Sequence, residues 1–344
     1  MSGNDKFNGP RGSNGPSGTR RLVAPELLPA LEMLPAFDFN AEVLRALRAG
    51  APVTKHMQPP PLSPEQQAVT CEQRFIPGPP GAPDVRVLVY TPPGQSEVTL
   101  RPAYLHVHGG GYVLGNPELN DGPNRSLAAE LGCVVVSVDY RLAPETRSPG
   151  AVEDCYAALL WLHGQTEQLR IDTTRVAIGG ESAGGGLAAA LAILARRRGE
   201  ARICFQMLDS AMLDDRTGSN SDPHPHCGEF VWTRNSNRFG WSCLLGVEPG
   251  GPEVPVDSVP ARTADLSGLP PTFIAVGALD LFLEENLEYA RRLMRAGVAT
   301  ELHVTPGAFH GFTLMGRDTP QVNTFWKLRQ DALARAFTDA NPHN

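Results

Sequence analysis

The chain has 344 residues, 41% of them hydrophobic, and a formal net charge of -7 at pH 7. This length allows one large domain or two ordinary ones, with enough apolar residues for a sizeable buried core. The charge provides no basic stripe for nucleic acid, and no apolar run approaches the roughly 20 residues that would span a membrane.

The first residues of the chain differ in composition from the rest. Residues 1–20 are rich in Gly, Asn, Ser and Pro and contain no apolar run of the kind found in secretory signals. We therefore predict a flexible leader and a cytoplasmic location, with a single domain over residues 21–344. None of the six cysteines has CxxC spacing, so neither a disulfide framework nor a metal site is expected.

Short apolar runs, some of them β-branched, alternate with longer helical patterns from residue 84 onward. The strand-like runs are 85–90, 103–107, 133–138, 175–178, 203–208, 272–276 and 301–304. The helical patterns are 124–131, 151–162, 187–198, 283–296 and 322–337. This alternation predicts an α/β fold with a mostly parallel sheet and helices on both faces.

Two segments do not follow this alternation. Residues 22–48 are apolar and helix-prone, and residues 214–259 are loop-like, with several Pro and Gly and two Trp. A long irregular insertion in a compact domain is usually functional. We expect both segments to form a cap over the carboxyl ends of the strands, where open α/β sheets bind ligands.

A serine lies at the apex of a glycine turn. Residues 180–184 read Gly-Glu-Ser-Ala-Gly between a predicted strand and a predicted helix. In such a turn the neighbours two positions away, Gly180 and Gly184, must be small, and the serine hydroxyl is exposed for attack. Ser182 is therefore the predicted nucleophile; the alternative is a structural serine that caps the following helix.

A second glycine turn precedes the first by about seventy residues. Residues 108–111 read His-Gly-Gly-Gly directly after the strand-like run 103–107. Attack on an ester creates an oxyanion that backbone amides can stabilise. We predict that the amides of Gly110, Gly111 and Ala183 supply these hydrogen bonds; the alternative is a merely flexible loop.

The base and the acid must follow the serine in the order serine, acid, histidine. Among nine histidines, His310 lies just after the last predicted strand, with glycines on both sides. Asp280 follows the run 272–276 closely and is the predicted acid. Glu284, four residues on, is the rival, but it falls inside the following helical pattern.

Taken together, these motifs resemble the hormone-sensitive-lipase-like family of α/β hydrolases, the bacterial family IV carboxylesterases. The matching stretches are 108–112, 139–145, 151–154, 180–184, 212–216 and 309–312. The resemblance implies an α/β-hydrolase fold with an eight-stranded sheet, a helical cap and no cofactor. It also implies that residues 140–145 buttress the oxyanion loop, and, since members are often dimers, that a homodimer is a candidate assembly.

Three features depart from the family pattern. Glu181 precedes the serine, where the family more often has Asp or Thr. The acid motif lacks its proline after Asp280. Asp209 and Ser210 stand where an apolar residue and Tyr are usual, so they are expected at the pocket or its edge.

The predicted activity is therefore that of a serine carboxylesterase on small-molecule esters of short to medium acyl chains. The rival from another class is a ligand-binding protein that kept the fold, as in the plant gibberellin receptors, which lack the catalytic histidine. Within enzymes, an amide- or lactone-cleaving hydrolase is the nearer alternative, because the same three residues serve all of these reactions.

Overall fold

The computed structural model describes residues 18–34, 38–50, 61–94, 100–219, 221–255, 257–315 and 319–339. Most of the predicted leader, and parts of both predicted cap segments, lie outside these ranges. No helix of the described residues is long and apolar enough to cross a membrane.

A single eight-stranded sheet runs through the protein in the order β1-β2-β4-β3-β5-β6-β7-β8. The strands are β1 (Thr70–Ile76), β2 (Val85–Thr91), β3 (Arg101–Val107), β4 (Val134–Asp139), β5 (Ile171–Glu181), β6 (Phe205–Asp209), β7 (Thr272–Gly277) and β8 (Thr300–Thr305). β2 pairs antiparallel with both of its neighbours, and the other pairs are parallel. The predicted mostly parallel sheet is thus confirmed, and its fold is that of an α/β hydrolase.

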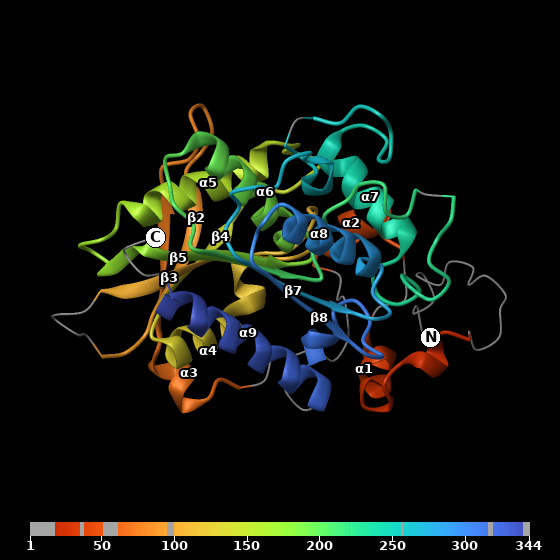
Figure 1. Ribbon diagram of the computed structural model, residues 1–344, viewed down its shortest axis with the longest axis horizontal. Helices are drawn as coiled ribbons and strands as arrows, with labels where there is room; N and C mark the ends of the chain where they lie inside the picture. The colour runs from red at the N-terminus through yellow and green to blue at the C-terminus, as the bar shows by residue number, and fades with distance from the viewer. Residues whose placement is uncertain are drawn as a thin grey trace.

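Helices cover both faces of the sheet, with α5, α6 and α8 over one face and α4 and α9 over the other (Figure 1). The α-helices are α1 (Leu28–Met33), α2 (Ala41–Arg48), α3 (Pro64–Ala68), α4 (Asp121–Leu131), α5 (Gly150–His163), α6 (Ala183–Arg198), α7 (Arg234–Leu245), α8 (Leu283–Arg295) and α9 (Pro320–Asp339). Five short 3-10 helices are η1 (Arg20–Leu22), η2 (Pro25–Leu27), η3 (Pro117–Asn120), η4 (Pro260–Arg262) and η5 (Phe312–Met315).

The strand alternation divides the buried residues into two cores. On β3, Leu105 and Val107 belong to the core under α5 and α6, whereas Tyr104 belongs to the core under α4 and α9. α6 is buried along nearly its whole length, which explains why its sequence is Ala- and Leu-rich on all sides instead of amphipathic.

Helix ends carry the expected capping residues. The side chain of Asn40 accepts hydrogen bonds from two amides at the start of α2, and Thr233 accepts one from Ser236 at the start of α7. α7 ends at Gly246, which has the left-handed conformation that glycine adopts without penalty.

The structure corrects two sequence expectations. The 214–259 segment contains a three-turn helix, α7, where loop-like structure was expected, because contacts with other segments stabilise a Gly- and Asn-containing stretch of modest helix propensity. The edge strand β1 was absent from the pattern-based prediction, since most of its residues are exposed and its sequence shows no apolar alternation.

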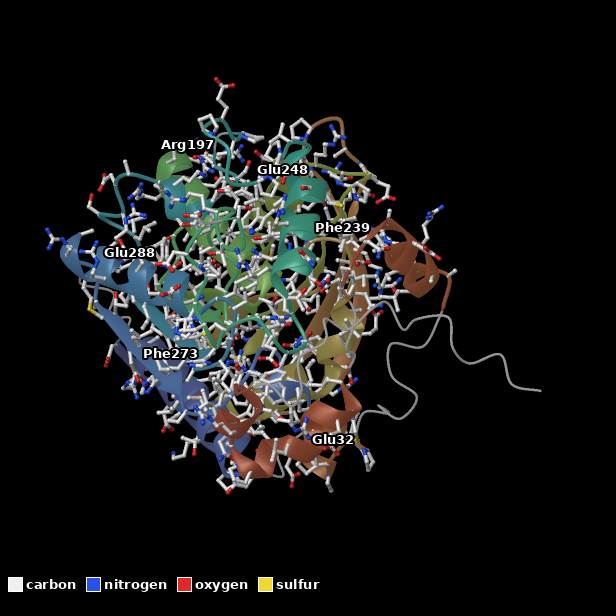
Figure 2. The ribbon with its side chains drawn as sticks, turned by 90° about the vertical axis from the view of Figure 1, so that its right-hand side faces the viewer. Glu32, Arg197, Phe239, Glu248, Phe273 and Glu288 are labelled. Atoms are coloured by element: carbon white, nitrogen blue, oxygen red, sulfur yellow. The ribbon has the colours of Figure 1, made fainter. Side chains whose placement is uncertain are left out.

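The two segments that broke the alternation lie against each other. The Phe39 amide donates to Ser236 Oγ at 2.9 Å, and the Phe39 and Trp232 rings lie 5.3 Å apart. Asp38 accepts hydrogen bonds from Thr233 and Asn235 at the start of α7. Figure 2 looks onto this side of the molecule, where α7 (Phe239 labelled) lies near α2, whereas α1 (Glu32 labelled) lies at the opposite end of the view.

Candidate active site

The serine turn has the tight geometry that its glycines predict. Ser182 lies between β5 and α6 with φ 57° and ψ -121°, a sparsely populated conformation for a side-chain-bearing residue. A Cβ atom at Gly180 would lie 2.2 Å from the Val107 carbonyl oxygen, and one at Gly184 would lie 2.0 Å from it. Only glycine fits at these two positions, so the strand β3 and the serine turn approach as closely as backbones can.

The serine, the histidine and the aspartate form a continuous hydrogen-bonded chain. Ser182 Oγ lies 3.0 Å from His310 Nε2, and His310 Nδ1 lies 2.9 Å from Asp280 Oδ2. Asp280 is fully buried, and Ser182 and His310 are 9% and 8% exposed. The structure thus brings together the three residues nominated from the sequence, whereas the rival acid Glu284 is exposed on α8.

Two loop-to-loop hydrogen bonds position the acid and the base. Asp280 follows β7 and His310 follows β8, which are adjacent parallel strands. The amide of Ala278 donates to the Thr305 carbonyl at 2.9 Å, and the amide of Leu279 donates to the Ala308 carbonyl at 2.8 Å. The two turns are therefore joined immediately before the aspartate and the histidine.

The oxyanion loop follows β3 and faces the serine turn. Gly110 and Gly111 have φ values of 124° and 61°. A Cβ atom at Gly110 would lie 2.1 Å from the Leu114 carbonyl oxygen. Within the described ranges, the amides of Gly110 and Gly111 donate no hydrogen bond to the protein, and Ala183 is the first residue of α6, where helix amides lack an internal partner.

Residues after β4 support this loop, as the resemblance implied. The Tyr140 hydroxyl donates to the His108 carbonyl at 2.9 Å, and the two rings stack with centroids 4.3 Å apart. The amide of Ala143 donates to the Tyr112 carbonyl at 2.9 Å. The segment after β4 therefore supports the loop through a backbone amide and a hydroxyl group.

Arg48, at the end of α2, was not singled out from the sequence. Its guanidinium donates to the carbonyls of Val113 at 2.8 Å and Ala143 at 2.7 Å and pairs with Glu145 at 2.8 Å. Arg48 thus joins the oxyanion loop to the segment that supports it. Nothing in the local sequence marks this arginine, because its three partners lie far away in the chain.

Glu181 links the serine turn to the oxyanion loop. Its carboxylate accepts a hydrogen bond from the Gly109 amide at 3.0 Å and lies 3.1 Å from His106 Nε2. Burial would raise the pKa of Glu181, but His106 and the Gly109 amide outweigh burial and lower it to about 2. A charged carboxylate therefore connects the two glycine turns.

Asp209, which was expected at the pocket or its edge, has its carboxylate against a side chain of α9. It ends β6, is 4% exposed, and its Oδ2 lies 2.5 Å from Nε of Arg329, which α9 carries and which is 5% exposed. The Asp209 carbonyl also accepts the Ser182 amide at 2.8 Å. Burial raises the pKa of the Asp209 carboxyl to about 6, although Arg329 acts in the opposite direction.

We expect this carboxyl to make stability depend on pH. Because the folded pKa of Asp209 lies above its ordinary value of 3.8, the stabilisation from its protonated form is complete below about pH 4 and is lost as the pH rises through about 6. The free energy of unfolding of the wild type, relative to Asp209→Asn, should therefore fall by up to about 3 kcal/mol between about pH 4 and pH 7.

Urea unfolding of both proteins across that range measures the difference. The neighbouring charged or titratable groups Arg329, Glu181, His106 and Tyr104 are common to both proteins. A difference between the two proteins that stays constant with pH would contradict the expectation.

Among the described residues, no group of three or more His, Cys, Asp or Glu side chains is arranged to hold a metal ion.

The strand order and the serine turn after β5 are those of the α/β-hydrolase fold. Comparison with known proteins gives the same assignment. Residues 104–314 match a family model described as alpha/beta hydrolase fold. The chain is 34% identical to the carboxylesterase NlhH of Mycobacterium tuberculosis over 259 residues, 74% of this chain and 78% of the relative. It is likewise 34% identical to the esterase LipI of the same organism over 257 residues, 73% of this chain and 77% of the relative.

Solved structures extend the similarity over most of the molecule. A bacterial heroin esterase is 37% identical and superimposes with a TM-score of 0.80, covering 93% of this chain and 99% of that one. The esterase LipW of Mycobacterium marinum is 31% identical with a TM-score of 0.76, covering 92% and 97%. The chain belongs to the hormone-sensitive-lipase-like family of α/β hydrolases.

Proposed function

We propose that the chain, a carboxylic ester hydrolase of this family, cleaves esters of short- to medium-chain acids through a serine acyl-enzyme. The observation that carries the mechanism is the hydrogen-bonded chain from Ser182 through His310 to Asp280. The carboxylesterase and esterase names of its relatives support ester substrates.

In the first step Ser182 Oγ attacks the ester carbonyl carbon while His310 Nε2 takes the serine proton. Asp280 keeps the proton of the imidazole on Nδ1 and stabilises the imidazolium that forms. The developing oxyanion accepts hydrogen bonds from the amides of Gly110, Gly111 and Ala183. Each such donor is worth about 3 kcal/mol of transition-state stabilisation.

The tetrahedral intermediate then collapses. His310 gives its proton to the leaving alcohol oxygen, and the acyl group remains bonded to Ser182. A water molecule takes the place of the alcohol, loses a proton to His310 and attacks the acyl carbon. The carboxylic acid leaves, and the proton returns to the serine oxygen.

Residues 22–48 and 214–259 form the cap in this proposal. Support comes from their mutual contacts, and from Gly240 of α7, where a Cβ atom would lie 2.8 Å from the Gly111 carbonyl oxygen. The cap thus packs directly on the oxyanion loop and, with the serine and the histidine only 9% and 8% exposed, would enclose the reacting groups.

A fluorophosphonate probe tests the proposal. Its phosphorus bonds to an activated serine oxygen with loss of fluoride, so we expect a mass adduct on the peptide that contains Ser182. The same protein should hydrolyse p-nitrophenyl esters, with kcat/KM highest for short to medium acyl chains and lower for long ones. His310→Ala should be labelled about a hundredfold or more slowly, because the base is missing.

A wild type that resists the probe and leaves every ester intact would favour the ligand-binding alternative. Labelling at Ser182 together with cleavage of anilides or lactones, and not of esters, would favour the amide- or lactone-cleaving alternatives. Rapid hydrolysis of long-chain esters alone would overturn the proposed acyl range.

A further inference from the structure

Trp232 lies between the oxyanion loop and the histidine. A Cβ atom at Gly111 would lie 2.2 Å from Cη2 of Trp232, so the indole edge packs against the loop backbone. The indole and the His310 ring have centroids 6.3 Å apart. No other aromatic side chain of the described residues is recorded in contact with both groups. Trp232 therefore lies beside both the oxyanion loop and the base, the two groups that a reacting ester must contact.

Several contacts hold the indole in place. Trp232 Nε1 donates to Asn237 Oδ1 at 3.1 Å, one turn into α7. The Phe39 ring lies 5.3 Å away on the other segment. Trp232 is 5% exposed, and changing its rotamer would break its hydrogen bond and its packing against Phe39. The indole is a rigid wall and not a mobile cover.

The reaction geometry indicates which part of the ester meets this wall. The carbonyl oxygen must face the loop amides, and the leaving oxygen must face His310 Nε2 to receive its proton. The alcohol group therefore extends past the histidine. A side chain that touches the loop and neighbours the imidazole stands on the alcohol side, whereas the acyl group departs in another direction.

We propose that Trp232 is a specificity-determining residue that limits the size of the alcohol part of the ester. The inference rests on the proposed function, and it narrows the substrate class to esters of small alcohols. Because a close-packed wall cannot yield to added volume without strain, each bulkier alcohol should lose transition-state binding, while the acyl group should be unaffected.

Two substrate series separate these effects. In the first series acetates carry ethyl, benzyl or 1-naphthylmethyl alcohols, and in the second series ethyl esters carry acetyl, butyryl or hexanoyl groups. For Trp232→Ala we expect the ratio of kcat/KM for 1-naphthylmethyl acetate to that for ethyl acetate to rise about tenfold or more over wild type. The ratio for ethyl hexanoate to ethyl acetate should stay within about twofold.

Ratios between substrates cancel differences in folded fraction, so a partly destabilised variant still gives a valid result. Trp232→Phe, which keeps an aromatic ring of smaller size, should give an intermediate rise. Trp241→Phe is the matched control on α7, the helix that begins directly after Trp232 and Thr233, since Trp241 is fully buried against Tyr112 and is not recorded in contact with His310. It should leave both ratios unchanged.

An unchanged alcohol ratio in both Trp232 variants would overturn the inference, as would a change in the acyl ratio as large as that in the alcohol ratio. A rise in Trp241→Phe equal to that in Trp232→Ala would also overturn it, because general loosening of α7 would then be the cause. These outcomes require an active wild type. A wild type inactive on every ester would instead refute the proposed function itself, and the inference with it.

Discussion

Ser182→Ala should lower kcat/KM for p-nitrophenyl butyrate by about a thousandfold or more. The substitution removes one oxygen atom and with it the acyl-enzyme, leaving only the oxyanion loop and substrate binding to accelerate attack by water. The residual rate should still exceed that of the buffer, because the amides of Gly110, Gly111 and Ala183 are unchanged. Initial rates, with burst-phase kinetics for the wild type, measure the effect.

The control for this variant is Ser126→Ala. Ser126 is a buried serine on α4, 6% exposed, whose Oγ accepts a hydrogen bond from Gln66 Nε2 at 2.9 Å, so its contact joins α4 to α3 and not to the serine turn. Its loss should cost about 1 kcal/mol of stability and leave kcat unchanged. Near wild-type activity in Ser182→Ala, with far-UV circular dichroism and melting intact, would refute the acyl-enzyme mechanism.

Backbone geometry could be predicted from the sequence where it depends on a short, local pattern. The serine turn needs two glycines within five residues, and the structure shows backbone oxygens 2.0–2.2 Å from where their side chains would begin. The strand that leads into that turn, β5, is buried over its last residues before Glu181, as expected for a central strand covered on both faces. Position along the chain then sufficed to nominate Asp280 and His310, because parallel strands end at one edge of the sheet.

Contacts between remote segments could not be predicted in this way. Arg48 is one of many arginines in the chain, and only folding brings it to the carbonyls of Val113 and Ala143. The helix α7 depends on partners in the N-terminal segment. Trp232 could be recognised as a tryptophan in an insertion, but its place beside Gly111 follows from packing alone.

The ion pair of Asp209 and Arg329 is the clearest example of a contact that the sequence could not predict. One member lies at the end of a strand and the other on the last helix, and no motif links the two. Two buried charges are stable together only through their mutual attraction, and removing one partner leaves the other without compensation. We therefore expect Arg329→Met to lower the free energy of unfolding by about 3–5 kcal/mol near pH 8. Urea denaturation measures this change.

The loss should be smaller near pH 5. Burial already raises the pKa of Asp209 to about 6, and removing Arg329, which lowers it, moves the pKa further upward. Below that value the carboxyl of the variant takes up a proton and no longer carries an unpaired charge. As the pH rises again, Asp209 of the variant ionises without a partner, so the deficit relative to wild type grows.

Two further variants separate the buried charge from general damage to α9. Asp209→Leu combined with Arg329→Met removes both charges and should recover most of the lost stability, since apolar pairs of similar volume replace buried ion pairs at little cost. Lys327→Ala, on the same helix, removes a surface pair with Asp331 whose lysine side chain is 74% exposed, and should change stability by less than about 1 kcal/mol. If the double variant were no more stable than Arg329→Met at pH 8, the uncompensated charge of Asp209 could not be the cause of the loss.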